Sequence, residues 1–231
     1  MPIPKLTQDE MQISRSQPEL ADWVDTTIEE FSKSPEGRKA WRLYQGECVK
    51  QLVEELLPIR WYADAFHRGD ADTRFEVVIG NQSYDAIVRD SDSSIAGYLQ
   101  VTLAFDGYQS RLRMEHLRDY GHAPMTGVEL ERGEDGKVAE TWSECEDKDL
   151  RISAEFQQIL TAFQKKAEKR YEKNTSLVVS FRSDGVIDED YMRRLDVFVN
   201  EQILPIEHTF ESLVFVSSSE GFYLGYATSA T

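Results

Sequence analysis

Cysteine and long apolar runs are scarce in this 231-residue sequence. The two cysteines, Cys48 and Cys145, form no CxxC pair and have no histidines at metal-ligand spacing around them, so we expect reduced thiols in a cytoplasmic protein. No stretch approaches the roughly 20 apolar residues that cross a bilayer. The first residues, "MPIPKLTQDEMQIS", lack the apolar segment of a signal peptide. These absences predict a soluble intracellular protein that has no membrane partner.

The signatures of several enzyme classes are absent as well. The chain has no GxxxxGK[ST] phosphate loop, no GxGxxG, no GxSxG elbow and no HExxH helix. The four histidines are scattered, and His116 and His122 are separated by "RDYG", which we expect to end a helix. Because a zinc pair on one helix ordinarily uses i, i+4 spacing, we do not predict a metal site at these histidines.

Positive charge is in short supply, since 26 Lys and Arg residues stand against 42 Asp and Glu residues, for a net charge of −16. A field of this sign repels polyanions, which disfavours a protein that coats nucleic acid, although a local basic groove stays open as a nucleic-acid contact. The simplest interpretation of an acidic surface is solubility. The same surface also suits a basic protein partner that the sequence does not identify.

Hydrophobic periodicity predicts a single α/β domain over residues 17–231, behind a flexible N-terminal segment over residues 1–16. Its core is a central mixed sheet built on a three-strand meander and flanked by helices. The expected helices cover residues 18–34, 35–59, 106–121, 151–173 and 188–203, and the expected strands cover residues 74–82, 84–90, 97–105, 176–181, 212–218 and 221–228. Residues 122–149 are predicted to be irregular and acidic.

One carboxylate lies in an unusual position within the meander. Strand alternation places Asp85 on a face that looks toward Gln100 and Thr102 of the next strand, whose opposite face is wholly apolar. Burying a carboxylate without a partner costs several kcal/mol. We therefore expect Asp85 to have a hydrogen-bond donor, a cation or a metal beside it.

Two flanking helices carry charged side chains within their apolar arcs. At about 100° per residue, Glu55 falls inside the arc of the second helix, whereas Glu47 and Glu54 fall outside it, toward solvent. Lys166 falls inside or at the edge of the arc of the helix over residues 151–173. Such residues either lay their stems along the edge of the core or aim at a site. Both interpretations stay open at this point.

The order of these elements resembles the PD-(D/E)XK nuclease superfamily over roughly residues 36–181. The resemblance rests on a helix with an inward glutamate, a meander with Asp85 on its second strand, and a later helix followed by the apolar strand "SLVVSF". In that superfamily the aspartate and a following acidic-x-Lys motif bind a divalent ion and activate water. Here Gln100 stands at the acidic position and Thr102 at the lysine position, so the motif is degenerate.

The resemblance also implies which residues would act. The superfamily sometimes moves its lysine to the following helix, where Lys166 lies. The implied catalytic residues are Asp85, Gln100 and Lys166, and the implied metal ligands are Glu55 and Asp85. Either no cofactor or Mg²⁺ is then expected, depending on whether such a site is active.

Three functions follow as hypotheses. The first is a catalytically degenerate nuclease-like domain that acts as an interaction or regulatory module. The second is an active Mg²⁺-dependent nuclease that cleaves phosphodiester bonds. The third is an acidic protein-binding domain of a phage or defence system, suggested by residues 129–149, where nine acidic residues face three basic ones.

Overall fold

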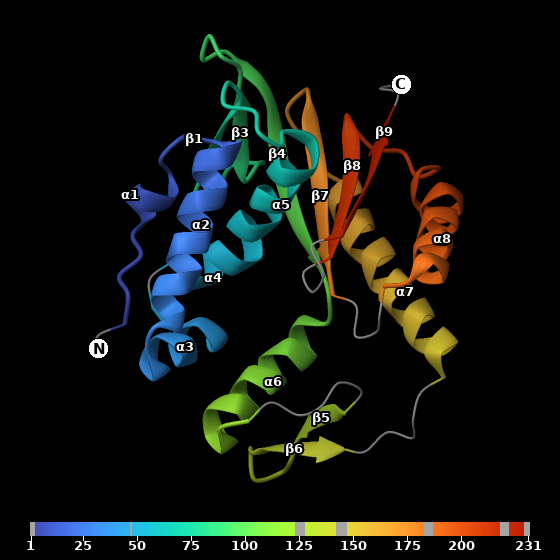
Figure 1. Cartoon of the computed structure of the whole chain (residues 1–231). Helices are drawn as coiled ribbons and strands as arrows, with labels where there is room; N and C mark the ends of the chain where they lie inside the picture. Colours follow the sequence, from blue (N-terminus) through green and yellow to red (C-terminus); the bar gives the residue numbers. More distant parts are fainter. Residues whose placement is uncertain are drawn as a thin grey trace.

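A seven-stranded mixed sheet runs through the middle of the molecule in the order β1-β2-β3-β4-β7-β8-β9 (Figure 1). This computed structural model describes residues 3–46, 48–122, 128–141, 147–182, 187–217 and 222–228. The sheet strands are β1 (Arg15–Ser16), β2 (Arg74–Val77), β3 (Ala86–Arg89), β4 (Ile95–Ala104), β7 (Thr175–Phe181), β8 (Ser212–Ser217) and β9 (Tyr223–Ala227). The predicted α/β class with a central mixed sheet is confirmed.

The strands from β1 to β4 pair antiparallel, β4, β7 and β8 pair parallel, and β9 closes the sheet antiparallel to β8. The segment from β2 to β4 is the predicted meander. The apolar strand β7 lies between β4 and β8 and is buried along its whole length. Its Leu177 and Val179 pack on one face of the sheet and its Val178 on the other, as expected for a strand covered on both sides.

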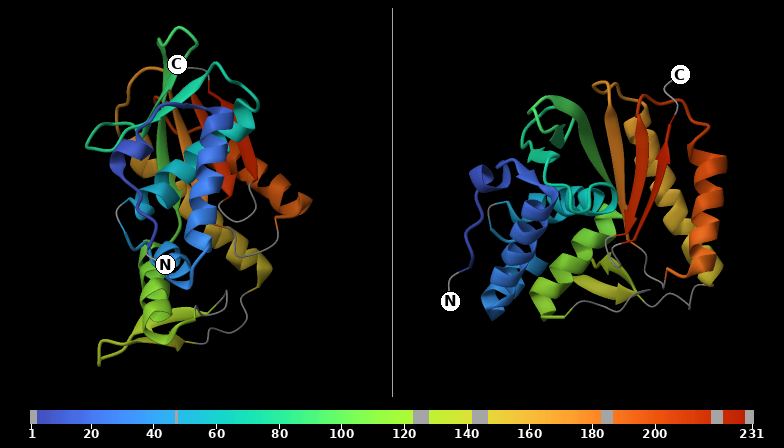
Figure 2. Two further views of the ribbon diagram at one scale, coloured as in Figure 1. Left: turned by 60° about the vertical axis from the view of Figure 1, so that its left-hand side comes forward. Right: turned by 45° about the horizontal axis from the view of Figure 1, so that its top comes forward.

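Helices cover both faces of the sheet (Figure 2). One face packs against α1 (Gln8–Met11), α2 (Gln17–Ser32), the π-helical turn η1 (Leu52–Leu56) and α5 (Leu57–Phe66). The other packs against α7 (Lys148–Ala167), α8 (Glu189–Phe198) and the π-helical turn η2 (Val199–Ile203). The short helix α4 (Val49–Gln51) leads into η1, and its Val49 packs with Phe31 and Ala40. The short helix α3 (Pro35–Arg42) packs on α2.

A smaller unit lies below the sheet in Figure 1, formed by α6 (Gly107–Tyr120) and the hairpin of β5 (Glu129–Arg132) and β6 (Val138–Thr141). Gly121 ends α6 in the left-handed conformation, as "RDYG" predicted. The hairpin occupies part of the acidic segment that we expected to be irregular. Residues 142–146 of that segment, which include Cys145, lie outside the described residues, as does the turn at residues 218–221.

The helix predicted over residues 35–59 is wrong in both its continuity and its end. The chain leaves α3 through positive φ angles at Tyr44, Gly46 and Cys48, and Glu47 lies outside the described residues. A new helix then starts at Val49 and continues past Pro58 to the end of α5. Pro58, near the start of α5, has no backbone N–H that would need an acceptor in the preceding turn. The π-helical turn before it interrupts the regular pattern of α-helical hydrogen bonds.

The segment predicted to be flexible over residues 1–16 contains α1 and the short strand β1. Thr7 and Glu10 form a reciprocal cap at the start of α1, and Met11 is completely buried. Arg15 is 7% exposed, donates to the carbonyl of Glu10 at 2.7 Å and pairs with β2. Burial of these side chains holds the segment against the domain.

Candidate functional site

The site begins where β3 stops and β4 continues. Ala86 pairs with Leu99 as the last register pair of these two strands, and the N–H of Asp85 still donates to the carbonyl of Leu99 at 2.8 Å. Beyond this point β4 runs on to Ala104 with β7 on one side and no paired strand on its β3 side among the described residues. The short β3 strand therefore leaves a notch along the edge of β4.

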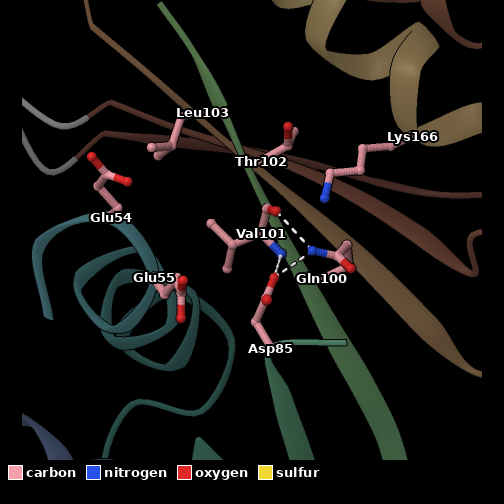
Figure 3. A pocket seen from close by; sticks show the side chains of 8 residues that line it. All are labelled: Glu54, Glu55, Asp85, Gln100, Val101, Thr102, Leu103 and Lys166. Carbon is pink, nitrogen blue, oxygen red and sulfur yellow. Dashed lines mark hydrogen bonds between the residues drawn. The ribbon is translucent and has the colours of Figure 1, made fainter. Parts of the chain in front are cut away.

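The carboxylate of Asp85 takes the place of a paired strand at the start of this notch. Its Oδ2 atom accepts the backbone N–H of Val101 at 2.6 Å, in the place where another strand would have bonded. The same oxygen accepts a hydrogen bond from Gln100 Nε2, which also donates to the carbonyl of Val101 at 2.9 Å (Figure 3). Because both partners of Nε2 are acceptors, the amide group of Gln100 is oriented with its NH₂ toward Asp85.

A cavity of about 310 Å³ opens at the notch. All four residues predicted for a site, Glu55, Asp85, Gln100 and Lys166, line it. The other lining residues are Glu54, Val101, Thr102 and Leu103. The glutamates come from η1 on one side of β4 and Lys166 comes from α7 on the other, so the pocket joins elements from both faces of the sheet (Figure 3).

Glu54 is the pocket residue that the sequence prediction placed toward solvent. That prediction assumed a regular α-helix, but the N–H of Leu57 bonds to the carbonyl of Leu52, five residues back, as in a π turn. The wider turn changes the angular position of the side chains around it, and both Glu54 and Glu55 reach the pocket. Pro58, which cannot supply the regular hydrogen bond, is the one sequence signal for this irregularity.

Burial and neighbouring charges shift the pKa values of the ionisable side chains in the pocket. Burial, Asp85 and Glu54 raise the pKa of Glu55 from its ordinary value of 4.5 to about 7, against the lowering effect of Lys50 and Lys166. Burial raises the pKa of Asp85, while the Val101 N–H, Lys166 and Gln100 oppose that rise. Burial lowers the pKa of Lys166, and Asp85 and Glu55 oppose it. Three carboxylates therefore share the pocket with one lysine, and Glu55 is about half protonated near pH 7.

The pocket residues, as they lie, do not fit a Mg²⁺ ion. Mg²⁺ requires hard oxygen ligands in a nearly octahedral arrangement. Asp85 Oδ2 already accepts two hydrogen bonds, and Gln100 offers its NH₂ group toward the carboxylate. Glu54, Glu55 and Asp85 are also not among the described groups whose three ligand atoms all lie within 4.8 Å of one another. The donors around Asp85 take the position that a cation would need.

No protein-family model, curated protein or solved structure matches this chain. Within the described part of the chain, none of the helices is both long enough and apolar enough to cross a membrane.

Proposed function

We propose that this protein is a nuclease-like α/β domain that does not hydrolyse phosphodiester bonds and that acts as an interaction or regulatory module. The observation that carries the proposal is the amide of Gln100, which donates to Asp85 and to the carbonyl of Val101. An acidic residue at that position would have added a ligand for a metal ion, whereas the amide supplies a donor instead. Asp85 then serves as a structural acceptor at the end of β3.

The chemistry of water activation supports the same conclusion. A metal-dependent nuclease needs ionised oxygens around its cation and a positive group near the attacking water. Thr102 cannot carry that positive charge. Lys166 reaches the pocket from α7, but burial lowers its pKa, and the negative charges of Asp85 and Glu55 act on it there.

The charge of the pocket indicates the chemistry of its partner. Glu54, Glu55 and Asp85 stand against Lys166, and the whole chain carries a net charge of −16. Such a pocket attracts a cationic side chain and repels a phosphate. We therefore propose a protein partner that presents lysine or arginine to the notch.

A cleavage assay tests the catalytic part of the proposal. Plasmid and single-stranded DNA and RNA are incubated with the protein in Mg²⁺ or Mn²⁺, beside Asp85→Ala and Lys166→Ala variants. The proposal expects no cleavage above that of the two variants. Metal-dependent cleavage that disappears in both variants would overturn it.

A gain-of-function pair sharpens this test. Gln100→Glu with Thr102→Lys restores the acidic-x-Lys pattern on β4, so we expect this double variant to bind Mg²⁺ where the wild-type pocket does not. Gln100→Leu with Thr102→Val removes the same two polar groups without adding charge and is the control. Equal Mg²⁺ binding by the wild type and the restored variant would contradict the role given to Gln100.

A binding experiment tests the partner chemistry. A labelled arginine-rich peptide is titrated at pH 8 into the wild type, into Glu54→Gln/Glu55→Gln, and into Glu129→Gln/Glu131→Gln, which removes the same number of carboxylates from the exposed side of the hairpin. We expect the pocket variant to lose more affinity than the hairpin variant. Equal losses would show that only net charge attracts the peptide and would reject the pocket as the binding site.

An active nuclease is the second candidate, and one observation favours it. Lys166 lies beside Asp85 in a pocket where Glu55 has a pKa of about 7, which suits a group that accepts a proton near neutral pH. The cleavage assay separates the two candidates directly, because this one requires activity that depends on Asp85, Glu55 and Lys166.

A further inference from the structure

A second cluster of chemically active side chains lies on the unit of α6, β5 and β6. Figure 1 shows this unit below the sheet. His116 comes from α6, His122 follows the Gly121 cap, and Glu140 comes from β6. Glu140 Oε1 lies 3.5 Å from His116 Nε2 and 3.8 Å from His122 Nε2. One ligand atom from each of the three residues lies within 4.8 Å of the other two.

Backbone carbonyls fix the tautomer that each imidazole ring adopts when it is neutral. His116 Nδ1 lies 3.1 Å from the carbonyl of His122, and His122 Nδ1 lies 3.3 Å from the carbonyl of Tyr120. A carbonyl oxygen only accepts, so in each ring the Nδ1 atom carries the proton that it donates. A neutral ring in this tautomer presents a lone pair at Nε2.

With both rings neutral, three acceptor atoms face one another: two Nε2 atoms and a carboxylate oxygen. Among the described residues, no donor is found that reaches any of these three atoms from the side chains or backbone around them. His116 is only 5% exposed, so water reaches its Nε2 atom poorly. Converging lone pairs repel one another unless a cation lies between them.

We propose that His116, His122 and Glu140 bind a transition-metal ion of the Zn²⁺ class. Bonds of about 2.1 Å to a tetrahedral Zn²⁺ separate neighbouring ligand atoms by about 3.4 Å, close to the two distances from Glu140. Two imidazoles and one carboxylate form a ligand set that Zn²⁺ accepts, with a fourth position left for water. The Nδ1–H bonds to carbonyls are the outer contacts that usually orient metal-binding histidines.

The metal would hold the hairpin to α6. Among the described residues, the hydrophobic cluster of this unit consists of Leu112, Leu130 and Val138. Gln109 and Glu115 of α6 already bond to Leu130 and Arg132 of β5. A metal that bridges the end of α6 to β6 would add a link to the second strand of the hairpin. The site differs from the notch in ligand type as well as place, since imidazole favours Zn²⁺ whereas the notch offers only carboxylates and an amide.

Calorimetric titration of the metal-free full chain with Zn²⁺ at pH 7.5 tests the proposal. The chain carries Asp85→Asn so that the notch does not contribute, and the three test variants are His116→Gln, His122→Ala and Glu140→Gln. We expect one equivalent of Zn²⁺ to bind and each variant to weaken it by at least about 10-fold. His122 is exposed, so its replacement leaves the fold intact if His116→Gln disturbs it.

Two matched controls identify the ligands. His67→Gln removes an imidazole that lies 3.4 Å from Asp70 without a third ligand, and Glu129→Gln removes a carboxylate from the neighbouring strand. Both are expected to keep full Zn²⁺ affinity. Absence of Zn²⁺ binding, or binding that His122→Ala and Glu140→Gln leave unchanged, would overturn the proposal. In that case a proton shared between His116 and Glu140 takes the place of the metal.

Discussion

The notch at β4 and the cluster on α6 and β6 both gather carboxylates with polar partners, but they satisfy them in opposite ways. At the notch, Asp85 receives the Val101 N–H and the Gln100 amide, so its charge is met from within the chain. At the cluster, Glu140 faces two imidazole nitrogens that the backbone has turned into acceptors. The first arrangement does without a cation, whereas the second requires one.

This difference shows why a count of acidic residues is a poor guide to metal binding. The notch has three carboxylates, yet the donors around Asp85 occupy the space of a ligand. The cluster has a single carboxylate. Its capacity to bind a metal comes from the two Nε2 atoms, which are acceptors in the neutral tautomers that the backbone carbonyls favour. The partners of each polar atom decide the outcome.

The largest effect is expected from removing the acceptor at the notch. Asp85→Ala leaves the Val101 N–H without a partner and removes one of the two acceptors of the Gln100 amide. The loss should lower the free energy of unfolding by about 2–3 kcal/mol, measured by urea denaturation in the absence of metal.

The conservative variant serves as the control for this prediction. Asp85→Asn keeps an acceptor oxygen for the Val101 N–H, so it should cost less than half as much as Asp85→Ala. If both variants left stability unchanged, Asp85 would not be a structural acceptor, and the contrast with the cluster would disappear.

Replacing Glu55 is expected to change the free energy of unfolding by a smaller amount, and to raise it rather than lower it. Its pKa in the folded chain is about 7, above the ordinary value of 4.5, so the folded state holds this proton more tightly than the unfolded state. Stability should therefore fall as the pH rises from about 4.5 to about 7, and Glu55→Gln should remove that fall. Above pH 7.5 the variant should be more stable by about 1–2 kcal/mol, a figure reduced for the exposed part of this side chain.

Denaturation curves at pH 4.5 and pH 8 check this sign. The variant and the wild type should agree at the lower pH and separate at the higher one. Glu129→Gln is the exposed control and should show no such separation. A gap that is largest at pH 4.5 would contradict the electrostatic account of the notch.

Replacing Glu140 in the cluster is expected to change the stability least, and the direction of that change should depend on whether zinc is present. Without metal, Glu140→Gln replaces a repelling carboxylate oxygen by an amide that can donate to an Nε2 atom, and should stabilise the chain by about 0.5–1 kcal/mol. With excess Zn²⁺ the wild type should gain stability by mass action while the variant gains little. Thermal unfolding with and without Zn²⁺ measures both, and a variant that is less stable without metal would contradict the repulsion.

Much of the fold could be predicted because its elements follow local patterns. The alternation around Asp85 and Gln100 gave the meander and placed the two side chains on the same face, and burial of "SLVVSF" on both sides followed from its apolar run. Asp188, the first residue of the helix predicted over residues 188–203, caps α8 by accepting the N–H of Tyr191.

The remaining features depend on irregular backbone or on distant contacts. Positive φ angles at Tyr44 and Cys48 break a helix that the apolar spacing alone would continue. The π turn that brings Glu54 into the notch changes the phase of an otherwise regular pattern. The cluster needs a hairpin to bring Glu140 to two histidines, and spacing within α6 carries no information about β6.

The most direct test of the account is the binding of Mg²⁺ to the metal-free wild type and to Asp85→Asn, measured by calorimetry at pH 7.5. If the Val101 N–H and the Gln100 amide replace a cation at Asp85, the two proteins should give the same curve, with no saturable binding that depends on Asp85. One equivalent of Mg²⁺ bound by the wild type and lost in Asp85→Asn would contradict the account and favour an active nuclease.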